Sequence, residues 1–529
     1  LKVRVGLNVQ MFFGGKIYTM RRPNETVEAV LIQNGLIKKI GTYKELAPLA
    51  TSFHPLHGKT MFPGFVDSHL HIIGLGEKLV RLQLGHCKTK KHLHIEIEKA
   101  LQRLSPGELL IGEGWSEYHL DQGNMLTLED LDRYLNNPII LHRVCHHVLL
   151  CNRTALQIAN VNEQTPDVVG GKIGRNDDNS LNGYFYEEAM QLVTNAFILE
   201  GENYVGYLTA CINRAIETMH QYGLVGGHSE DCSYYGHYMN VVKAYEQSVG
   251  KQKHFRVSIL RHHKMFEQMV HDNIKDIPGF IEYGAMKIFA DGSFGGSTAA
   301  LLQPYEHEED NRGLLIHSDE QFENYIKESR RAGEAIAVHM IGDRAAEQVI
   351  TMIEKYPTPS GKRDRLIHCC LLTESQLERM KKLEIVLDIQ PSFVLSDFPW
   401  IEQKLGKNRL PFAYAWKTLS HFPCALGTDA PIEDVNPFAT IYAAVTRKKV
   451  GSEQIYNESQ CLSVFEAIKM YTNGSAFAIG KEAERGLILE GYVADFTIVN
   501  QDLLTIQSEQ MLNTTVIETI VDGHTVYKH

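Results

Sequence analysis

The central part of the chain alternates short, continuously apolar runs with longer stretches of helical periodicity. Apolar runs without alternating polar positions are typical of strands that are buried on both faces of a parallel sheet. The pattern predicts strands at residues 61–66, 284–289, 334–338, 365–368, 384–389 and 423–427. Helical segments such as 344–354 and 374–383 stand between the later strands. We therefore expect consecutive β–α units, which is an α/β fold.

This repeat favours a (β/α)8 TIM barrel over an open, doubly wound sheet. The open sheet is the main rival, but no Gly-x-Gly-x-x-Gly motif follows its first strand. The stretch between His71 and Lys287 is too long for two ordinary β–α units. We expect it to hold the second and third barrel strands and a large insertion at about 75–200.

Both ends of the chain have a different pattern, made of short strands and turns. Asn34-Gly35 between two apolar runs is a strong hairpin signal, and residues 491–500 and 516–527 are also strand-like. We therefore expect a small composite β-sandwich domain built from both termini, residues 1–62 and 482–529. The barrel domain would then span 63–481.

Composition narrows the classes of partner. The formal net charge of −11 provides no basic surface, so we expect no nucleic acid partner. No apolar run is long enough to span a bilayer, so we expect no membrane partner. Nine cysteines with scattered spacing indicate reduced thiols and a cytoplasmic protein. Oligomeric state leaves no trace in the sequence, and a homodimer is the prior expectation.

Side chains that bind metals stand where the apolar runs give way to polar loops. His69 and His71 are two residues apart at the end of a strand, so their imidazoles point to the same side. Another His-x-His pair, His92 and His94, shows that such a pair alone is weak. The ordered set is far more specific, and it consists of His69, His71, Lys287, His339, His368 and Asp429. We expect these residues to form a metal site at the carboxyl ends of the strands.

Each member of this set also has an ordinary structural interpretation. Lys287 could form an ion pair with Asp291, and the histidines could be ordinary core residues. Asp429 could cap a turn. A single-metal site with an unmodified lysine is a further alternative. The glycine-rich segment Gly292–Thr298 suggests a phosphate cradle but lacks the P-loop pattern, so we interpret it as an active-site loop.

Motifs along nearly the whole chain resemble the amidohydrolase superfamily of metal-dependent hydrolases, and most closely its YtcJ-like branch. The matching segments are Pro63–His71, Gly114-Trp115, Lys287–Ser293, His339–Arg344, Gln390–Phe393, Gly427–Pro431, Ala443–Arg447 and Gly491–Asp495. Two positions depart from the family pattern. Tyr492 stands where the closing motif has Lys, and Ile367 stands where a glutamate often precedes the histidine of the sixth strand.

The resemblance implies a TIM barrel, a composite β-sandwich and one or two divalent ions, for which zinc suits the ligands best. It assigns His69, His71 and Asp429 to one ion and His339 and His368 to the other. Lys287 becomes an N6-carboxylated bridge between the ions, and Asp429 becomes the general base. Three further positions that recur in the family are candidate substrate contacts: Trp115, His147 and Arg409.

The resulting hypothesis is a metal-dependent hydrolase that cleaves a carbon–nitrogen bond other than a peptide bond. A metal-bound hydroxide would attack an N-acyl amine, an N-formyl amine or a cyclic amide of a small molecule. An ester or lactone hydrolase, or a deaminase, would need the same ligands. A third alternative is a non-catalytic regulatory or binding protein on the amidohydrolase scaffold.

Overall fold

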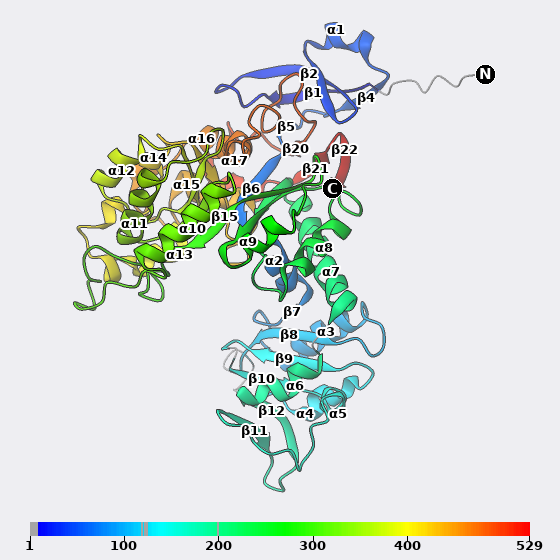
Figure 1. Ribbon diagram of the computed structural model, residues 1–529. Coiled ribbons are helices and arrows are strands. Elements are labelled where there is room, and N and C mark those ends of the chain that lie inside the picture. The colour runs from blue at the N-terminus through cyan, green and yellow to red at the C-terminus, as the bar shows by residue number, and fades with distance from the viewer. Residues whose placement is uncertain (1–8, 118–119, 121–124, 146, 198–199) are drawn as a thin grey trace. The chain divides into compact units, whose positions relative to one another are not determined.

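The computed structural model describes residues 9–117, 120, 125–145, 147–197 and 200–529 (Figure 1). The chain separates into two compact units. The larger unit combines Leu1–Gly74 with Ala215–His529, and the smaller unit is the segment Leu75–Arg214. The smaller unit therefore interrupts the larger one within a single stretch of sequence.

The larger unit is organised around a parallel sheet of eight strands. Their spatial order is β19 (Cys424–Leu426), β18 (Ile385–Ile389), β17 (Asp364–His368), β16 (Ile336–Met340), β15 (Ile281–Phe289), β14 (Arg256–His262), β13 (Leu224–Ser229) and β6 (Phe65–Leu70). Each strand pairs in parallel with its neighbour in chain order. The observed strands overlap the six predicted ones, and the α/β barrel prediction is confirmed.

Two backbone hydrogen bonds join the first strand to the segment that follows the last. The N–H of His71 donates to the carbonyl of Ala430 over 2.8 Å, and the N–H of Asp429 donates to the carbonyl of His69 over 2.7 Å. The sheet is thereby bent into a nearly closed barrel. The two ends of the barrel sheet meet at the residues that the sequence marks as metal ligands.

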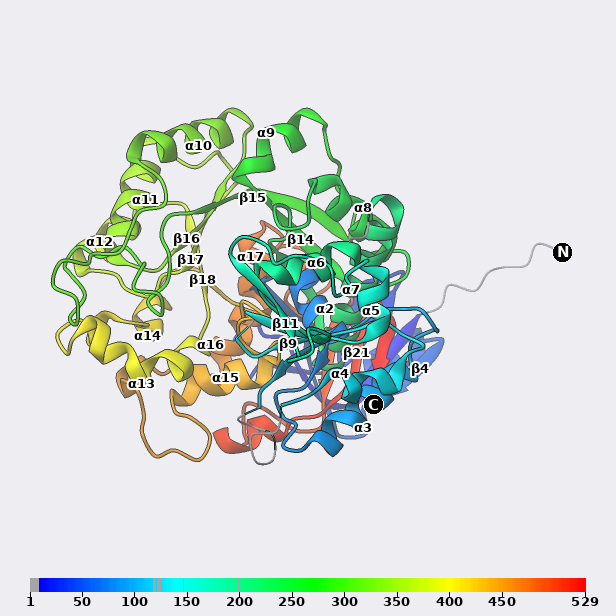
Figure 2. The same cartoon turned by 90° about the horizontal axis from the view of Figure 1, so that it is seen from below.

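Helices surround the barrel strands, and Figure 2 shows α10, α11 and α12 outside β16, β17 and β18. The helices that accompany the barrel strands in this unit include α8 (Tyr238–Ser248), α9 (His263–His271), α10 (Asp319–Arg331), α11 (Asp343–Lys355), α12 (Glu374–Met380), α13 (Phe393–Leu405), α14 (Trp416–Leu419), α15 (Pro437–Thr446), α16 (Val464–Lys469) and α17 (Ser475–Ala478). Local sequence defines several starts. Ser318 and Gln321 form a capping box at α10, and Thr373 and Gln376 form one at α12.

A second eight-stranded sheet is assembled from both ends of the chain. Its strands are β1 (Gln10–Tyr18), β2 (Thr26–Gln33), β3 (Leu36–Gly41), β4 (Ser52–Pro55), β5 (Thr60–Pro63), β20 (Phe496–Val499), β21 (Val516–Val521) and β22 (His524–Lys528), with the short helix α1 (Tyr43–Leu46). β20 pairs with β5 and so unites the two ends. Asn34 and Gly35 have φ values of 53° and 74°, as the predicted hairpin turn requires.

The terminal sheet is attached to the amino ends of the barrel strands, away from the candidate ligands. Thr497 accepts a hydrogen bond from the N–H of Phe65 and donates to the carbonyl of Gly223. The guanidinium of Arg256, the first residue of β14, donates to both carboxylate oxygens of Asp495. These buried contacts connect the C-terminal segment to the barrel.

The smaller unit has its own sheet, with strand order β11-β12-β10-β9-β8-β7. The strands are β7 (Leu82–Gln83), β8 (Leu110–Trp115), β9 (Ile139–Arg143), β10 (Val148–Cys151), β11 (Gly171–Arg175) and β12 (Leu181–Glu187). Helices α3 (Lys90–Leu101), α4 (Leu128–Leu131), α5 (Arg153–Ile158) and α6 (Gln191–Thr194) accompany them, while α2 (Ile72–Val80) and α7 (Gly201–Gln221) cross the boundary between the units. Among the described residues, no helix is long and apolar enough to cross a bilayer.

Candidate metal centre

His69 and His71 stand at the carboxyl end of the first barrel strand, β6. The Nε2 atom of His69 lies 3.6 Å from Oδ1 of Asp429, and that of His71 lies 3.4 Å from the same oxygen. Nδ1 of His71 contacts the carbonyl of Glu230 at 2.6 Å, which orients the ring. The structure therefore brings both histidines to the aspartate that follows the last strand.

His368, the last residue of β17, completes a cluster of three candidate ligands. One ligand atom each from His69, His368 and Asp429 lies within 4.8 Å of the others. Nδ1 of His368 contacts Oε1 of Gln390 at 2.8 Å, so Nε2 is left for the cluster. The backbone φ values of His368 and Asp429 are 74° and 59°, in the left-handed region that residues other than glycine seldom adopt.

His339 lies beside this cluster, near the end of β16. Its ring centroid is 4.6 Å from that of His368. Its Nε2 atom contacts the carbonyl of Gly292 at 3.0 Å and lies 3.7 Å from Oδ1 of Asp291. The structure thus places His339 next to His368, with its Nε2 atom directed to the loop after β15.

Lys287 is fully buried in β15 and faces the histidines. Its Nζ atom lies 3.3 Å from Nε2 of His69. Burial lowers the pKa of Lys287 to about 8, against the opposing negative charges of Glu230 and Asp429. Asp291 accepts hydrogen bonds from the N–H groups of Ala300, Ile341 and Gly342, so it supports the neighbouring loops.

Three buried polar residues near the centre escaped the sequence reasoning: Asp67, Glu230 and Gln390. Asp67 accepts hydrogen bonds from the N–H of His69 and from both the N–H and hydroxyl of Thr428. Glu230 follows β13, is fully buried and carries an Oε1 atom without a hydrogen-bond partner. The signal that was available for Asp67 is a carboxylate directly after the apolar run 61–66. No such signal marks Glu230, because glycines and a histidine interrupt Val225-Gly-Gly-His-Ser-Glu230.

The charges around the cluster fit a cation. Burial and the nearby charge of Lys287 keep the pKa of His69 well below its usual value, so this imidazole is neutral. Burial acts to raise the pKa of Asp429, but the hydrogen bond from His71 and the charge of His368 outweigh it, so the carboxylate is ionised. Burial also disfavours the charged form of His71, yet Asp429 raises the pKa of that imidazole to about 9. A divalent cation would take the place of the proton that His71 holds beside Asp429.

A donor set of neutral imidazoles and one carboxylate matches the ligands of zinc and related divalent metals. In addition, the buried Nδ1 atom of His69 has no hydrogen-bond partner. The residues at the barrel end therefore fit a divalent metal ion, with His69, His368 and Asp429 as its most compact ligand group.

The three candidate substrate contacts lie in different surroundings. Trp115 ends β8 in the smaller unit, is 1% exposed and donates its indole N–H to the carbonyl of Leu141. It packs in that unit's core, so its placement adds no support for a contact with substrate. His147 is exposed and pairs with Glu187 over 2.8 Å. Arg409, in the larger unit, donates to the carbonyls of Gln303 and Leu405 beside a surface hollow.

Comparison with known proteins places the chain in a family. The profile of the amidohydrolase family matches residues 55–527. YtcJ of Bacillus subtilis (strain 168) is 41% identical, and the match covers 98% of this chain and 99% of that protein. The N-substituted formamide deformylase of Arthrobacter pascens is 24% identical, with 97% of each chain covered.

A solved structure agrees with these sequence matches. The crystal structure of an uncharacterized metal-dependent hydrolase from Pyrococcus furiosus superposes with a TM-score of 0.76 and 27% identity. The superposition covers 94% of this chain and 100% of that one. With a barrel that carries candidate metal ligands at its strand ends and a family profile that matches nearly all of its length, this chain belongs to the amidohydrolase family.

Proposed function

We propose that this protein is a metal-dependent hydrolase that cleaves a carbon–nitrogen bond, of the N-acyl or N-formyl amine kind, in a small molecule. The observation that carries the proposal is the cluster of His69, His368 and Asp429, which come together at the barrel end from β6, β17 and the segment after β19. Two relatives add support through their names, a formamide deformylase and a metal-dependent hydrolase.

The assignment that the family resemblance implies would give His69, His71 and Asp429 to one ion and His339 and His368 to a second. The compact group of His69, His368 and Asp429 would then combine ligands of both ions. Zinc suits this mixture of imidazole and carboxylate ligands best. A bound divalent ion supplies Lewis acidity, which polarises the scissile carbonyl and acidifies water. His69, His368 and Asp429 are each at least nine-tenths buried, so bulk water does not compete for these groups.

Asp429 is the residue that we assign to proton transfer. Its carboxylate is ionised because its pKa lies below the ordinary value. It can therefore accept the proton of the attacking water and pass that proton to the leaving nitrogen, which departs as a neutral amine. The contacts of Asp429 with His69 and His71 hold the carboxylate in place for this role.

Lys287 provides the bridge in the proposal. Because its pKa is lowered to about 8, about a tenth of the amine is neutral at pH 7, far more than in an ordinary lysine. The neutral amine can add to CO₂ with release of one proton, which forms a carbamate with two oxygen donors. A carbamate supplies negative charge between two cations, whereas an ammonium group would repel them.

The test combines metal content with turnover. Elemental analysis of protein purified without chelators or added metal should find metal in the wild type and a clear loss in His368→Ala. His147→Ala is the matched control, because that histidine is exposed on the smaller unit and should leave the content unchanged. A panel of N-formyl amines, N-acyl amines, cyclic amides and the corresponding esters then tests the bond. Turnover of esters alone would replace the C–N assignment, and no turnover by metal-loaded protein would favour a binding role.

A further inference from the structure

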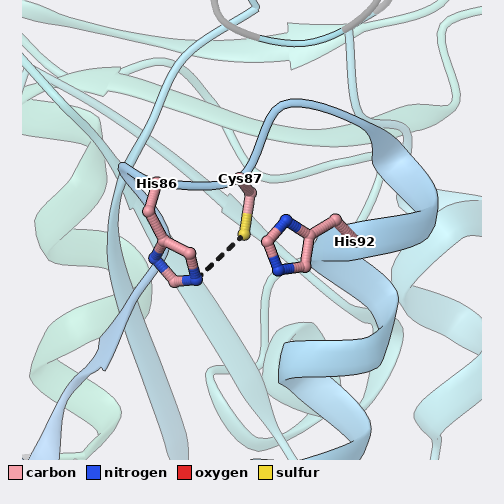
Figure 3. A group of neighbouring side chains, drawn as sticks. All are labelled: His86, Cys87 and His92. Carbon is pink, nitrogen blue, oxygen red and sulfur yellow. Dashed lines mark hydrogen bonds between the residues drawn. The ribbon is translucent and has the colours of Figure 1, made fainter.

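The smaller unit contains a second group of metal-type ligands that shares no residue with the barrel centre. His86 and Cys87 lie in the loop after β7, and His92 lies in the first turn of α3 (Figure 3). One ligand atom from each of the three lies within 4.8 Å of the others. We propose that these three residues, with Glu96 as fourth ligand, form a structural zinc-type site.

Local backbone structure sets the positions of the three side chains. The N–H of Cys87 donates to the carbonyl of Leu84 over 3.0 Å, which forms a turn that presents His86 and Cys87. Thr89 caps α3 by accepting a hydrogen bond from the N–H of His92 over 3.0 Å. Helix start and turn are thus specified by short-range contacts, which keep the loop against the first turn of the helix.

The side chains converge on the sulphur atom. Figure 3 shows His86 and His92 on either side of Cys87, and Sγ of Cys87 lies 4.0 Å from Nε2 of His86. The two imidazole rings are 5.1 Å apart at an angle of 80°, so they do not stack. Zinc bonds of about 2.3 Å to sulphur and about 2.0 Å to nitrogen place tetrahedral ligands about 3.5 Å apart. An adjustment of about an ångström therefore suffices to close the site.

Glu96 follows His92 by one helical turn, on the same face of α3. Its Oε1 atom lies 3.8 Å from Nε2 of His92 and 2.8 Å from Nζ of Lys99. Its carboxylate adds a fourth donor to two imidazoles and a thiol, which gives the number of ligands that tetrahedral zinc takes, from three residue types that bind zinc. Exposed Lys99 would release the oxygen at little cost, because surface ion pairs contribute little.

The ordinary alternative is a core cysteine with two unrelated histidines nearby. Cys87 is indeed 1% exposed and packs with Leu84, Leu93 and Ile97 in the core of the smaller unit. That alternative accounts for the burial of Cys87. It does not explain why two imidazoles lie close to the sulphur atom. A metal ion bound there would link the β7–α3 loop to the helix.

Cobalt provides a test that is independent of enzyme activity. A thiolate ligand gives Co²⁺ an intense sulphur-to-metal charge-transfer band in the near ultraviolet, and the proposed barrel ligands include no cysteine. The full-length protein, stripped of metal and titrated with Co²⁺, should show this band. Cys87→Ser should abolish it and remove about one ion per chain, whereas Cys145→Ser, a partly exposed cysteine of the same unit, should retain it.

Further variants separate this site from the barrel centre and from misfolding. His86→Ala, at an exposed position, should weaken cobalt binding at least ten-fold while circular dichroism stays unchanged. Glu96→Gln should also weaken it, and an unchanged affinity would remove Glu96 from the ligand set. His368→Ala should lose barrel metal yet keep the charge-transfer band. A wild-type titration without the band, or a band that persists in Cys87→Ser, would overturn the proposed site.

Discussion

Nε2 of His71 lies 3.4 Å from Oδ1 of Asp429, and this contact joins the end of the first barrel strand to the segment that follows the last. Backbone hydrogen bonds between the same two segments close the barrel. The contacts that close the barrel therefore also bring the candidate metal ligands together. A substitution where these two segments meet therefore affects the metal ligands directly.

Asp429→Asn tests the proposed role of Asp429 in proton transfer. The amide has nearly the same shape as the carboxylate but cannot accept the proton of an attacking water, so kcat should fall by about 100-fold to 10,000-fold. The measurement is the steady-state rate on the substrate that the wild type turns over best. Circular dichroism verifies the fold, and elemental analysis verifies that the variant keeps its metal, because Asp429 is also a candidate ligand. A variant that retains most of its activity would assign proton transfer to another group, and the buried carboxylate of Glu230 would be the next to examine.

Lys287→Ala tests the bridge. If Lys287 carries a carbamate, its loss should lower the metal content by about one ion per chain and reduce turnover. A small carboxylate such as formate, added to the variant, should restore part of the activity by occupying the vacated space. Elemental analysis and rate measurements with and without formate check both expectations. Unchanged metal content would instead make Lys287 a buried lysine that only hydrogen-bonds His69.

Arg256→Met tests the attachment of the C-terminal segment to the barrel. Asp495 is 8% exposed and would keep a buried charge without its partner, so the free energy of unfolding should fall by about 3–5 kcal/mol. Denaturant unfolding followed by circular dichroism measures this loss. The double variant Arg256→Met/Asp495→Leu should recover part of it, because no buried unpaired charge remains. Asp522, which Arg256 also contacts, is 38% exposed. Equal stability of the wild type and the single variant would contradict the structural role of this pair.

His220 predicts a specific acid sensitivity. Burial lowers the pKa of this histidine to about 4, whereas an unfolded histidine titrates near 6.5. Between these values the unfolded state binds the additional proton, so stability is present above pH 6.5 and falls as the pH drops toward 4. At pH 5 this one group should cost about 2 kcal/mol relative to pH 7.

His220→Gln provides the comparison for this prediction. The Nε2 atom of His220 contacts the carbonyl of His254, and a glutamine amide can donate the same hydrogen bond without titrating. Denaturant unfolding at pH 7 and pH 5 should therefore show a smaller pH-dependent loss in the variant than in the wild type. Identical losses in both proteins would show that His220 is not the responsible group.

Much of the barrel could be predicted because its strands are buried on both faces. Continuous apolar runs marked six of the strands, and the polar residues at their ends marked the ligand set. The second and third barrel strands, β13 and β14, were expected only as a pair within a long stretch. Two glycines and a histidine interrupt Leu224–Ser229, which obscures its apolar pattern.

Local spacing could not distinguish the two His-x-His pairs. His69 and His71 end a strand, where alternate residues share a side, and they meet at Asp429. His92 and His94 lie on helix α3, where residues two apart point in different directions. His92 instead faces His86 and Cys87, a grouping that depends on how the loop folds back on the helix.

The sequence by itself determined the α/β repeat, the terminal strands and the order of the ligand-type residues, because each depends on local periodicity. Only the tertiary structure decided which of those residues meet. Asp67, Glu230 and Gln390 support the centre through contacts between segments far apart in the chain. Trp115 lies in the core of the smaller unit, which its sequence neighbours did not indicate, because burial is set by the packing of whole strands.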